Sequence, residues 1–473
     1  MQAPGRTNSR GSATRFDGGV AVSRTENERL LEKQARRESN ARTYPRHLPM
    51  AIRRAEGVEV EDADGNVYYD CLAGAGTLAL GHNHPAVVQA IEEVLDASGP
   101  LHALDLATPT KDGFVDALFD SLPDEFADSA RVQFCSPAGT DAVEAALKLV
   151  KTATGNRSVL AFQGGYHGMT HGALGLMGDT DPKADVPGTM PDVHHLPYPY
   201  DYRCPFGIGG EEGRRTASRY VERVLDDPES GITDPAGMVL ELVQGEGGAI
   251  PAPDEWTREI RRTTRERDIP LVVDEIQTGL GRTGELYAFE HADIVPDAVT
   301  LSKAVGGGLP LAVVVYDEEL DAWEPGAHAG TFRGDQLAMA AGRATIEHVV
   351  ENDLDAHAAR MGDRLRGRLE ATAEAFDCVG DVRGRGLMLG AEIVDPTAEP
   401  DDLGSYPTDA DRASAIRTAC FERGLVVELG GRHGSTVRFL PPLVVTKDDV
   451  DAIAERFHEA VGEAVAANEV TAA

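Results

Sequence analysis

Lys303 stands where a lysine side chain could do covalent chemistry. It follows the apolar run Ala298-Val-Thr-Leu301 and precedes a glycine-rich turn, in a chain that has only seven lysines. An amine at the end of a buried strand is shielded from water. Because this desolvation disfavours the charged form, it lowers the pKa of the amine and makes it a usable nucleophile or Schiff-base former. Position alone favours such a function no more than it favours an ordinary surface lysine.

Asp274 ends another apolar run, Ile269-Pro-Leu-Val-Val-Asp274. A carboxylate in such a place needs a partner that favours its charge. In open α/β sheets, ligands bind at the carboxyl ends of the strands, so this side chain is expected to point toward a binding crevice. A structural cap is an equally common role for such an aspartate.

Gly139 and Thr140 lie between an expected strand and an expected helix. The first turn of a helix offers unpaired N–H groups and a positive dipole, Gly139 permits close approach, and Thr140 adds a hydroxyl. This combination predicts an anion site, most naturally for phosphate. The alternative is a plain threonine cap.

A dinucleotide-binding pattern also occurs, as Gly279-Leu-Gly281-Arg-Thr-Gly284. Taken literally, it would indicate a nicotinamide-dependent oxidoreductase. No amphipathic helix begins at its third glycine, however, so we expect an irregular loop and a false match.

The elements that must position these residues alternate between strand-like and helical patterns. Short apolar or β-branched runs lie at residues 131–135, 158–162, 238–243, 269–274, 298–301 and 310–316. Helical patterns lie at 140–151 and 256–268. The alternation predicts an α/β fold with a large, mostly parallel, doubly wound sheet.

The pattern changes after residue 335. A long helical stretch (336–376) precedes a strand-like run (386–394), a helix (411–422), two strands (425–428 and 436–440) and a terminal helix from 447. This mixture predicts a smaller α+β domain, and the alternating segment 58–72 could join either sheet. We therefore expect a disordered start (1–25), an N-terminal segment of the small domain (26–80), a large domain (81–335) and a C-terminal small domain (336–473). The Tyr- and Pro-rich passage 196–207 is expected to be a loop of unknown role.

The composition restricts the possible partners. The chain has 79 Asp and Glu against 45 Lys and Arg, a formal charge of −34. Because nucleic acids and anionic membranes are bound through cationic contacts, we expect neither as a partner. An acidic excess that prefers Arg to Lys resembles proteins from salt-rich cytoplasm.

Other features predict a cytoplasmic protein without a metal. No apolar stretch is long enough for a membrane span, and residues 1–19 have no signal-peptide core. The five cysteines are odd in number and scattered, so neither disulfides nor a metal site are indicated.

Taken together, the motif Asp274-Glu-Ile-Gln-Thr-Gly-Leu-Gly-Arg-Thr-Gly284 and the pair Ser302-Lys303 resemble the class III, or ω-, aminotransferases. The resemblance implies the fold type I architecture and pyridoxal 5'-phosphate as cofactor. It implies that Asp274 binds the pyridine nitrogen, that Gln277 approaches the phenolic oxygen, and that Lys303 holds the cofactor as a Schiff base.

Further motifs extend this resemblance. Tyr166-His167-Gly168 looks like the segment whose aromatic ring stacks on the cofactor, and Thr331 occupies the position that reaches the phosphate in a neighbouring subunit. The enzyme is therefore expected to be a homodimer or a larger assembly. Glu246 and Arg438 resemble a pair in which the glutamate covers the arginine until a substrate α-carboxylate needs it.

Three positions depart from the family pattern, namely Ala138, Leu242 and Asp335, where Ser, Pro and Asn are common. The first removes one possible phosphate donor. The other two have no interpretation from the sequence.

Several segments resemble one branch of the family, the L-2,4-diaminobutyrate:2-oxoglutarate 4-aminotransferases. They are Ser39-Asn-Ala-Arg42, residues 71–85, residues 163–169 and residues 198–206. This branch implies an amino donor and a 2-oxo acid as small-molecule partners. Enzymes for 4-aminobutyrate, ornithine or a related diamine stay open, as do the oxidoreductase and a regulatory or structural protein that has kept the fold.

Overall fold

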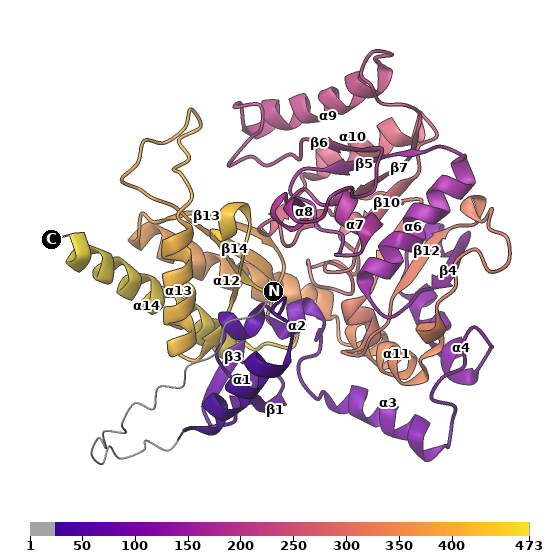
Figure 1. Cartoon of the computed structure of the whole chain (residues 1–473). Helices are drawn as coiled ribbons and strands as arrows, with labels where there is room; N and C mark the ends of the chain where they lie inside the picture. The colour runs from indigo at the N-terminus through magenta and orange to yellow at the C-terminus, as the bar shows by residue number, and fades with distance from the viewer. Residues whose placement is uncertain (1–23, 473) are drawn as a thin grey trace, which may run out of the picture.

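A mostly parallel, seven-stranded sheet lies among helices on the right in Figure 1. The computed structural model describes residues 24–472. In pairing order, the strands are β4 (Ala130–Phe134), β12 (Val313–Asp317), β11 (Ala298–Leu301), β10 (Leu271–Asp274), β7 (Pro235–Leu240), β5 (Ser158–Phe162) and β6 (Val193–Leu196). All adjacent strands from β11 to β6 are parallel, whereas β12 is antiparallel to both β11 and β4. The predicted α/β architecture is thus confirmed.

The sheet is buried on both faces because its strands carry apolar residues at consecutive positions. On β10, Leu271 and Val273 join one hydrophobic core, while Val272 joins the other. Helix α6 (Gly139–Thr154) packs against β7, β11 and β12, and the apolar side of α10 (Asp254–Arg265) fills the opposite core. Helices on both faces explain why these strands are continuous apolar runs.

Further helices surround this sheet or precede it in the chain. They are α1 (Glu26–Arg37), α2 (Ala73–Gly76), α3 (Pro85–Asp96), α4 (Pro109–Asp120), α5 (Asp124–Ala127), α7 (His171–Leu176), α8 (Asp181–Ala184), α9 (Gly210–Asp226) and α11 (Gln336–Glu351). Short 3-10 turns are η1 (Tyr44–Arg46), η2 (Ala288–Ala292), η3 (Lys303–Gly306), η4 (Glu318–Leu320), η5 (Thr331–Gly334) and η6 (Arg432–Gly434).

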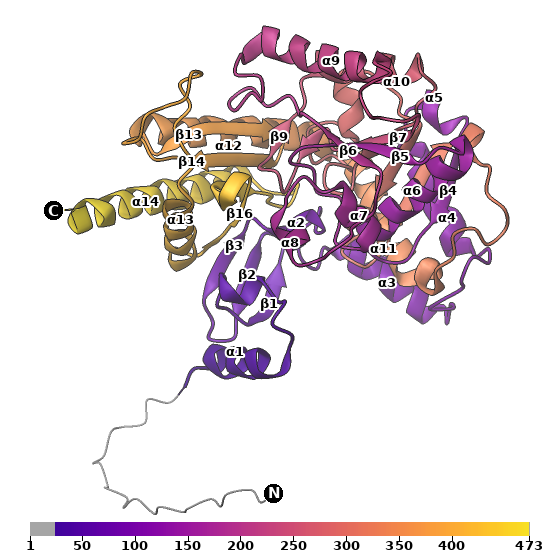
Figure 2. The same cartoon turned by 45° about the horizontal axis from the view of Figure 1, so that its top comes forward.

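A second sheet, entirely antiparallel, is built from the C-terminal part of the chain. Its order is β13 (Val379–Arg385), β14 (Met388–Ile393), β17 (Thr436–Phe439) and β16 (Glu428–Gly430). The helices α12 (Leu354–Ala375), α13 (Ala410–Glu422) and α14 (Lys447–Ala472) lie beside it (Figure 2). A small hairpin, β8 (Val243–Gln244) with β9 (Ile250–Pro251), follows β7.

The segment 58–72 joins neither of these two sheets. It supplies β2 (Glu59–Asp62) and β3 (Val67–Asp70), which follow β1 (Ile52–Glu56) in a separate sheet. Strand β15 (Leu425–Val426) completes this sheet by pairing in parallel with β3. The N-terminal strands therefore associate with a C-terminal strand. In Figure 2, β1, β2 and β3 lie below the C-terminal elements.

The structure also differs from several expectations. The predicted helix 336–376 is two helices, α11 and α12, separated where Asp353 adopts a positive φ of 48°. Strands β1, β6, β9 and β13 were not predicted. The predicted disordered start lies outside the described residues except for its last two, of which Thr25 caps α1. The predicted domain limits stay a prediction.

Within residues 24–472, no helix combines the length and the apolar character that a membrane span requires.

Candidate active site

A pocket of about 300 Å³ lies at the carboxyl ends of the strands of the large sheet. Loops that follow β4, β5, β7, β10 and β11 contribute its walls. The lining residues are Ala138, Gly139, Thr140, Tyr166, His167, Gly168, Met169, Glu241, Glu246, Asp274, Ile276, Gln277, Thr278 and Lys303. Of the predicted site residues, only Arg438 and Thr331 are not among them.

Asp274 is paired with His167 at the base of this pocket. Both side chains are nearly fully buried, and Oδ2 of Asp274 lies 2.7 Å from Nδ1 of His167. Burial lowers the pKa of His167, but its hydrogen bond to Asp274 and the charge of that carboxylate outweigh burial, so the pKa is raised. His167 therefore supplies the polar partner that a buried carboxylate requires.

Lys303 directly follows β11 and Ser302, in a left-handed backbone conformation with φ of 49°. Such a conformation costs about 1 kcal/mol or more for a residue with a Cβ. Burial lowers the pKa of its amine, and the opposing charge of Glu246 reduces the shift without cancelling it. The amine is therefore easier to deprotonate than an exposed lysine.

The start of α6 forms the wall predicted to bind an anion. Thr140 Oγ1 lies 2.6 Å from Thr170 Oγ1, and a Cβ on Gly168 would come within 2.4 Å of Thr140 Oγ1. Gly168 has φ of 119°, so both its conformation and its space favour glycine. A Cβ on Gly139 would meet Ile276 at 3.0 Å. The loop after β5 can therefore lie directly against the helix N-terminus.

Glu241 is a buried carboxylate that the sequence analysis missed. Its Oε1 accepts a hydrogen bond from the backbone N–H of Tyr166 (2.8 Å), and its Oε2 accepts one from Gly245 (2.9 Å). Burial raises the pKa of Glu241 to about 7, although His167 lowers it in part. Its only signal in the sequence is a glutamate inside the apolar run 238–243.

Glu246 and Arg438 are brought together from distant parts of the chain. Glu246 lies in the turn of the β8–β9 hairpin, Arg438 lies on β17, and Arg438 Nη2 donates to Glu246 Oε2 at 2.7 Å. Arg438 is 2% exposed, and its Nε and Nη1 have no partner. Burial raises the pKa of Glu246, but Arg438 and Lys303 outweigh it and the net shift is downward.

Gln277 lies beside the turn that carries Glu246, since its side chain is the nearest neighbour that a Cβ on Gly245 would meet. Its Nε2 donates to the carbonyl oxygen of Ala75 at 3.1 Å, while its Oε1 is buried without a partner. An unpaired buried amide oxygen is costly, so a ligand group that donates to it would be favoured.

Thr331 lies in η5 and is exposed. Near it are four exposed apolar side chains, Leu101, Leu104, Leu106 and Phe332, with relative exposures of 56, 47, 67 and 61%. The ring of His102 packs edge-on against Phe332, and the N–H of Gln336 donates to Leu101 O. We call these four residues the η5 patch.

The segment Gly279 to Gly284 forms turns and does not begin a helix. Within it, the nearly fully buried Arg282 donates to the carbonyl oxygens of Leu387 and Pro441. The glycines therefore allow distant segments to approach each other closely. Because no helix begins at the third glycine, the dinucleotide-binding interpretation is not supported.

Comparisons with known proteins identify the family of the chain. Residues 40–461 match the family model described as aminotransferase class-III. A protein named diaminobutyrate--2-oxoglutarate aminotransferase from Rhizobium meliloti is 56% identical over 433 residues, 92% of each chain. A protein of the same name from Haemophilus influenzae is 47% identical over 93% of this chain and 96% of its own.

Solved structures show the same fold. An (S)-enantioselective omega-transaminase from Thermomicrobium roseum, 26% identical, aligns with a TM-score of 0.81 over 92% of this chain and 98% of its own. An amine transaminase from an uncultivated Pseudomonas species, solved with pyridoxal phosphate, is 25% identical with a TM-score of 0.79, over 96% and 99% of the two chains. The fold is that of the fold type I pyridoxal-phosphate enzymes, and the chain belongs to the class III aminotransferase family.

Proposed function

We propose that this enzyme transfers the 4-amino group of L-2,4-diaminobutyrate to 2-oxoglutarate, giving L-aspartate 4-semialdehyde and L-glutamate. The physiological direction proposed is the reverse, which makes diaminobutyrate. The observation that carries the substrate assignment is the identity of 56% and 47%, over more than nine-tenths of the chain, to two proteins that bear this activity in their names.

The cofactor is pyridoxal 5'-phosphate, and the pocket residues fit it. The anionic phosphate matches the N-terminus of α6 with Gly139 and Thr140, against which the missing Cβ of Gly168 lets the loop after β5 pack closely. Asp274 would bind the pyridine nitrogen, and Gln277 would approach the phenolic oxygen. Tyr166, with His167 behind it, supplies the aromatic face.

When bound, the cofactor supplies a ring that accepts electrons from the substrate carbon. Asp274, held by His167, would keep the proton on the pyridine nitrogen and so maintain this capacity. Lys303 would hold the cofactor until an amino donor takes its place. As a free, neutral amine, Lys303 would then move the proton at the substrate carbon.

The Glu246–Arg438 pair explains how one pocket accepts two different substrate ends. Glutamate presents a carbon that bears a carboxylate, and the planar fork of Arg438 matches that group once Glu246 moves aside. Diaminobutyrate presents its terminal carbon, which has no carboxylate, and Glu246 then neutralises Arg438. The free Nε and Nη1 of Arg438 are the donors available to the carboxylate.

The same proposal includes a homodimer in which Thr331 of one subunit approaches the phosphate site of the other. The η5 patch supports it, because exposed apolar side chains that cluster together mark surfaces that associate. A cytoplasmic location is also part of the proposal, and the five cysteines, all free, suit a reducing compartment.

The decisive experiment combines donor specificity with the place of cofactor attachment. The purified protein is given a panel of donors (diaminobutyrate, ornithine, 4-aminobutyrate) with 2-oxoglutarate, and glutamate formation is measured. We expect diaminobutyrate to give the highest kcat/KM. A higher kcat/KM for another donor would make that donor the substrate in place of diaminobutyrate.

Borohydride reduction followed by peptide mapping tests the site itself. We expect the cofactor to be fixed at Lys303 and Lys303→Ala to have no turnover. A label on another lysine, or turnover retained by Lys303→Ala, would contradict the assignment of the pocket.

A further inference from the structure

The Tyr- and Pro-rich segment 197–207, here called the tyrosine loop, lies against the hairpin that carries Glu246. Tyr198 and Tyr200 are nearly fully buried, with 2% and 4% exposure. Tyr198 donates from its hydroxyl to the carbonyl oxygen of Glu241 at 2.9 Å, and Tyr200 donates to the carboxylate of Glu392 on β14. Two side chains of one loop thus contact both the large sheet and the C-terminal sheet.

Glu392 connects the tyrosine loop to Arg383 on β13. Its carboxylate accepts from Arg203 Nε of the loop at 2.6 Å and lies 2.8 Å from Arg383 Nη1. The ring of Tyr200 also lies 5.0 Å from the guanidinium carbon of Arg383. A buried guanidinium with two carboxylate neighbours, Glu392 and Asp381, has little freedom to move.

Arg383 in turn joins the two segments that carry the Glu246–Arg438 pair. Its Nε donates to the carbonyl oxygen of Gly248 at 2.8 Å, in the turn of the β8–β9 hairpin, two residues after Glu246. Its Nη2 donates to Thr436 Oγ1 at 3.0 Å, on β17, two residues before Arg438. One planar group therefore fixes the turn relative to the strand.

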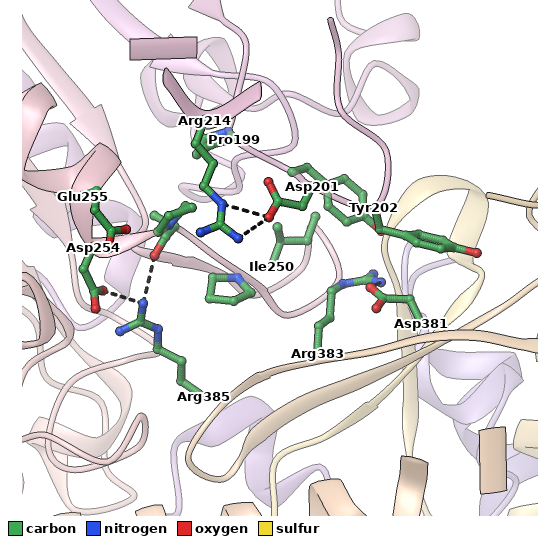
Figure 3. Close-up of a pocket in the computed structure, with 14 residues that line it drawn as sticks. Pro199, Asp201, Tyr202, Arg214, Ile250, Asp254, Glu255, Asp381, Arg383 and Arg385 are labelled. Carbon is green, nitrogen blue, oxygen red and sulfur yellow. Dashed lines mark hydrogen bonds and ion pairs between the residues drawn. The ribbon is translucent and has the colours of Figure 1, made fainter. Parts of the chain in front are cut away.

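Arg383 acts from outside the candidate active site. It lines a different cavity, of about 450 Å³, between the tyrosine loop, the hairpin and β13 (Figure 3). Figure 3 shows Arg383 beside Asp381 on one side of this cavity, while Arg385 pairs with Asp254 and Arg214 with Asp201 elsewhere in it. Any effect of Arg383 on the reaction must therefore pass through the residues it holds.

We propose that Arg383, held by Glu392 and the tyrosine loop, is a positioning residue that fixes the Glu246 turn against β17 and thereby sets the preference between the two substrates. This inference rests on the proposed function. With the backbone of the turn fixed, only the side chain of Glu246 needs to move when a carboxylate arrives. Glu246 then returns to the same place on Arg438 when the substrate end has no carboxylate.

Loss of the contacts that Arg383 makes with the Glu246 turn and with β17 should affect the two substrates differently. A turn that moves as a whole lets Glu246 leave Arg438 at a lower cost, which favours the open state that glutamate uses. The closed state, which the diamine uses, becomes less populated. The ratio of kcat/KM for diaminobutyrate to kcat/KM for glutamate should therefore fall, whereas a general structural defect would lower both values together.

The test uses holoenzyme variants in both half-reactions, measured in single turnovers. Thr436→Val removes one acceptor of Arg383 without changing side-chain shape, and Tyr200→Phe removes the hydroxyl that holds Glu392. Arg383→Lys keeps the charge but cannot reach Gly248 and Thr436 together. We expect the ratio to fall about tenfold in Thr436→Val and Arg383→Lys, the size typical for a hydrogen bond to a charged group. Arg214→Lys, in the same cavity but paired with Asp201, should keep the wild-type ratio.

A second readout does not depend on turnover. Hydrogen exchange of the peptide that spans residues 243–251 should be faster in Thr436→Val and Arg383→Lys than in the wild type. An unchanged ratio, equal loss in both half-reactions, or unchanged exchange would overturn the role of Arg383. If the wild type does not use diaminobutyrate at all, the proposed function fails instead, and the exchange experiment still decides the role of Arg383.

Discussion

Asp274 is held by two contacts that come from different parts of the chain. His167 contacts Oδ2 at 2.7 Å, and the N–H of Ile276 donates to Oδ1 at 3.1 Å. A carboxylate that is 4% exposed needs such partners, because a buried charge without them is costly. A neutral acid at this position could not hold a proton on a pyridine nitrogen.

Asp274→Asn should therefore lower kcat at saturating cofactor by roughly 100-fold or more, the range in which correctly placed acid–base groups contribute. The variant keeps the shape of the side chain but not its charge. His167→Asn is the control, because its amide can still donate to Asp274 and should lower kcat much less. Single-turnover rates at several cofactor concentrations measure both. Normal turnover in Asp274→Asn would contradict the role.

Glu275, next to Asp274, faces away from the pocket and should make stability depend on pH. Burial raises its pKa to about 7 from the ordinary glutamate value near 4.5, although its hydrogen bonds to Thr278 and Phe289 oppose the shift. Because the folded state then binds the proton more tightly, this residue favours folding at low pH. Its contribution is lost as pH rises from about 4.5 to about 7, by about 3 kcal/mol at most.

Glu275→Gln should remove this part of the pH dependence, since an amide does not titrate. The free energy of unfolding in denaturant, measured between pH 5 and pH 8, checks the prediction. Glu370→Gln, on the exposed side of α12, should keep the wild-type slope. Equal slopes in wild type and Glu275→Gln would show that Glu275 is ionised at little cost.

From position alone, the sequence predicted site residues only where a chemical group lay next to the end or the start of a recognisable element, and the other site residues came from the family resemblance. Lys303 and Asp274 each follow an apolar run, so their places at the edge of the sheet could be expected. Glu241 could not be assigned, because its partners are the backbone N–H groups of Tyr166 and Gly245. Those two groups meet only in the folded chain, and no local pattern records their approach.

Among the helices, α11 begins at a side-chain cap, because Asp335 is its N-cap residue. Its Oδ1 accepts from the N–H groups of Leu337 (3.0 Å) and Ala338 (3.1 Å). Asn and Asp are about equally good caps, which accounts for an aspartate where the family often has asparagine. Nothing in the structure explains Leu242.

Asp335→Ala should lower the free energy of unfolding by about 1 kcal/mol, because two N–H groups at the start of α11 lose their acceptor. Asp335→Asn is the matched control and should stay within a few tenths of a kcal/mol of the wild type. Denaturant unfolding of the three proteins measures the difference. An Asp335→Ala variant as stable as Asp335→Asn would mean that solvent replaces the cap.

Strands could be predicted from the sequence where nearly every residue of the strand is buried. Strands β5, β10, β11 and β12 are buried along nearly their whole length, so apolar composition marks them. Strand β6 carries two histidines at the edge of the sheet, and β13 carries charges that pair across it, so neither resembles a buried strand. The break between α11 and α12 depends on a single residue with positive φ, Asp353.

For the whole molecule, the charge of −34 predicts that salt stabilises the fold. Carboxylates outnumber cations over the surface, and counterions screen the resulting repulsion. The Tm should therefore rise as KCl increases from about 0.05 M to about 1 M, over which the Debye length falls from more than 10 Å to about 3 Å. The rise should be much smaller near pH 4, where many carboxylates are protonated. A Tm that falls with KCl would contradict this dependence.

Charged substitutions in the η5 patch test whether one subunit alone forms a complete site. A Cβ on Gly330 would come within 2.2 Å of Ser136 Oγ, so η5 lies close to the segment that leads into α6 while Thr331 is exposed. Phe332→Glu, alone or with Leu106→Glu, introduces charge into the patch and should shift sedimentation toward the monomer. Because a partner subunit would then be missing from the phosphate side, cofactor affinity should fall at least tenfold, which corresponds to the loss of about 1.4 kcal/mol. Tyr220→Glu, on the exposed side of α9, is the control and should change neither quantity. Monomers that bind the cofactor as tightly as the wild type would show that each subunit builds its site alone.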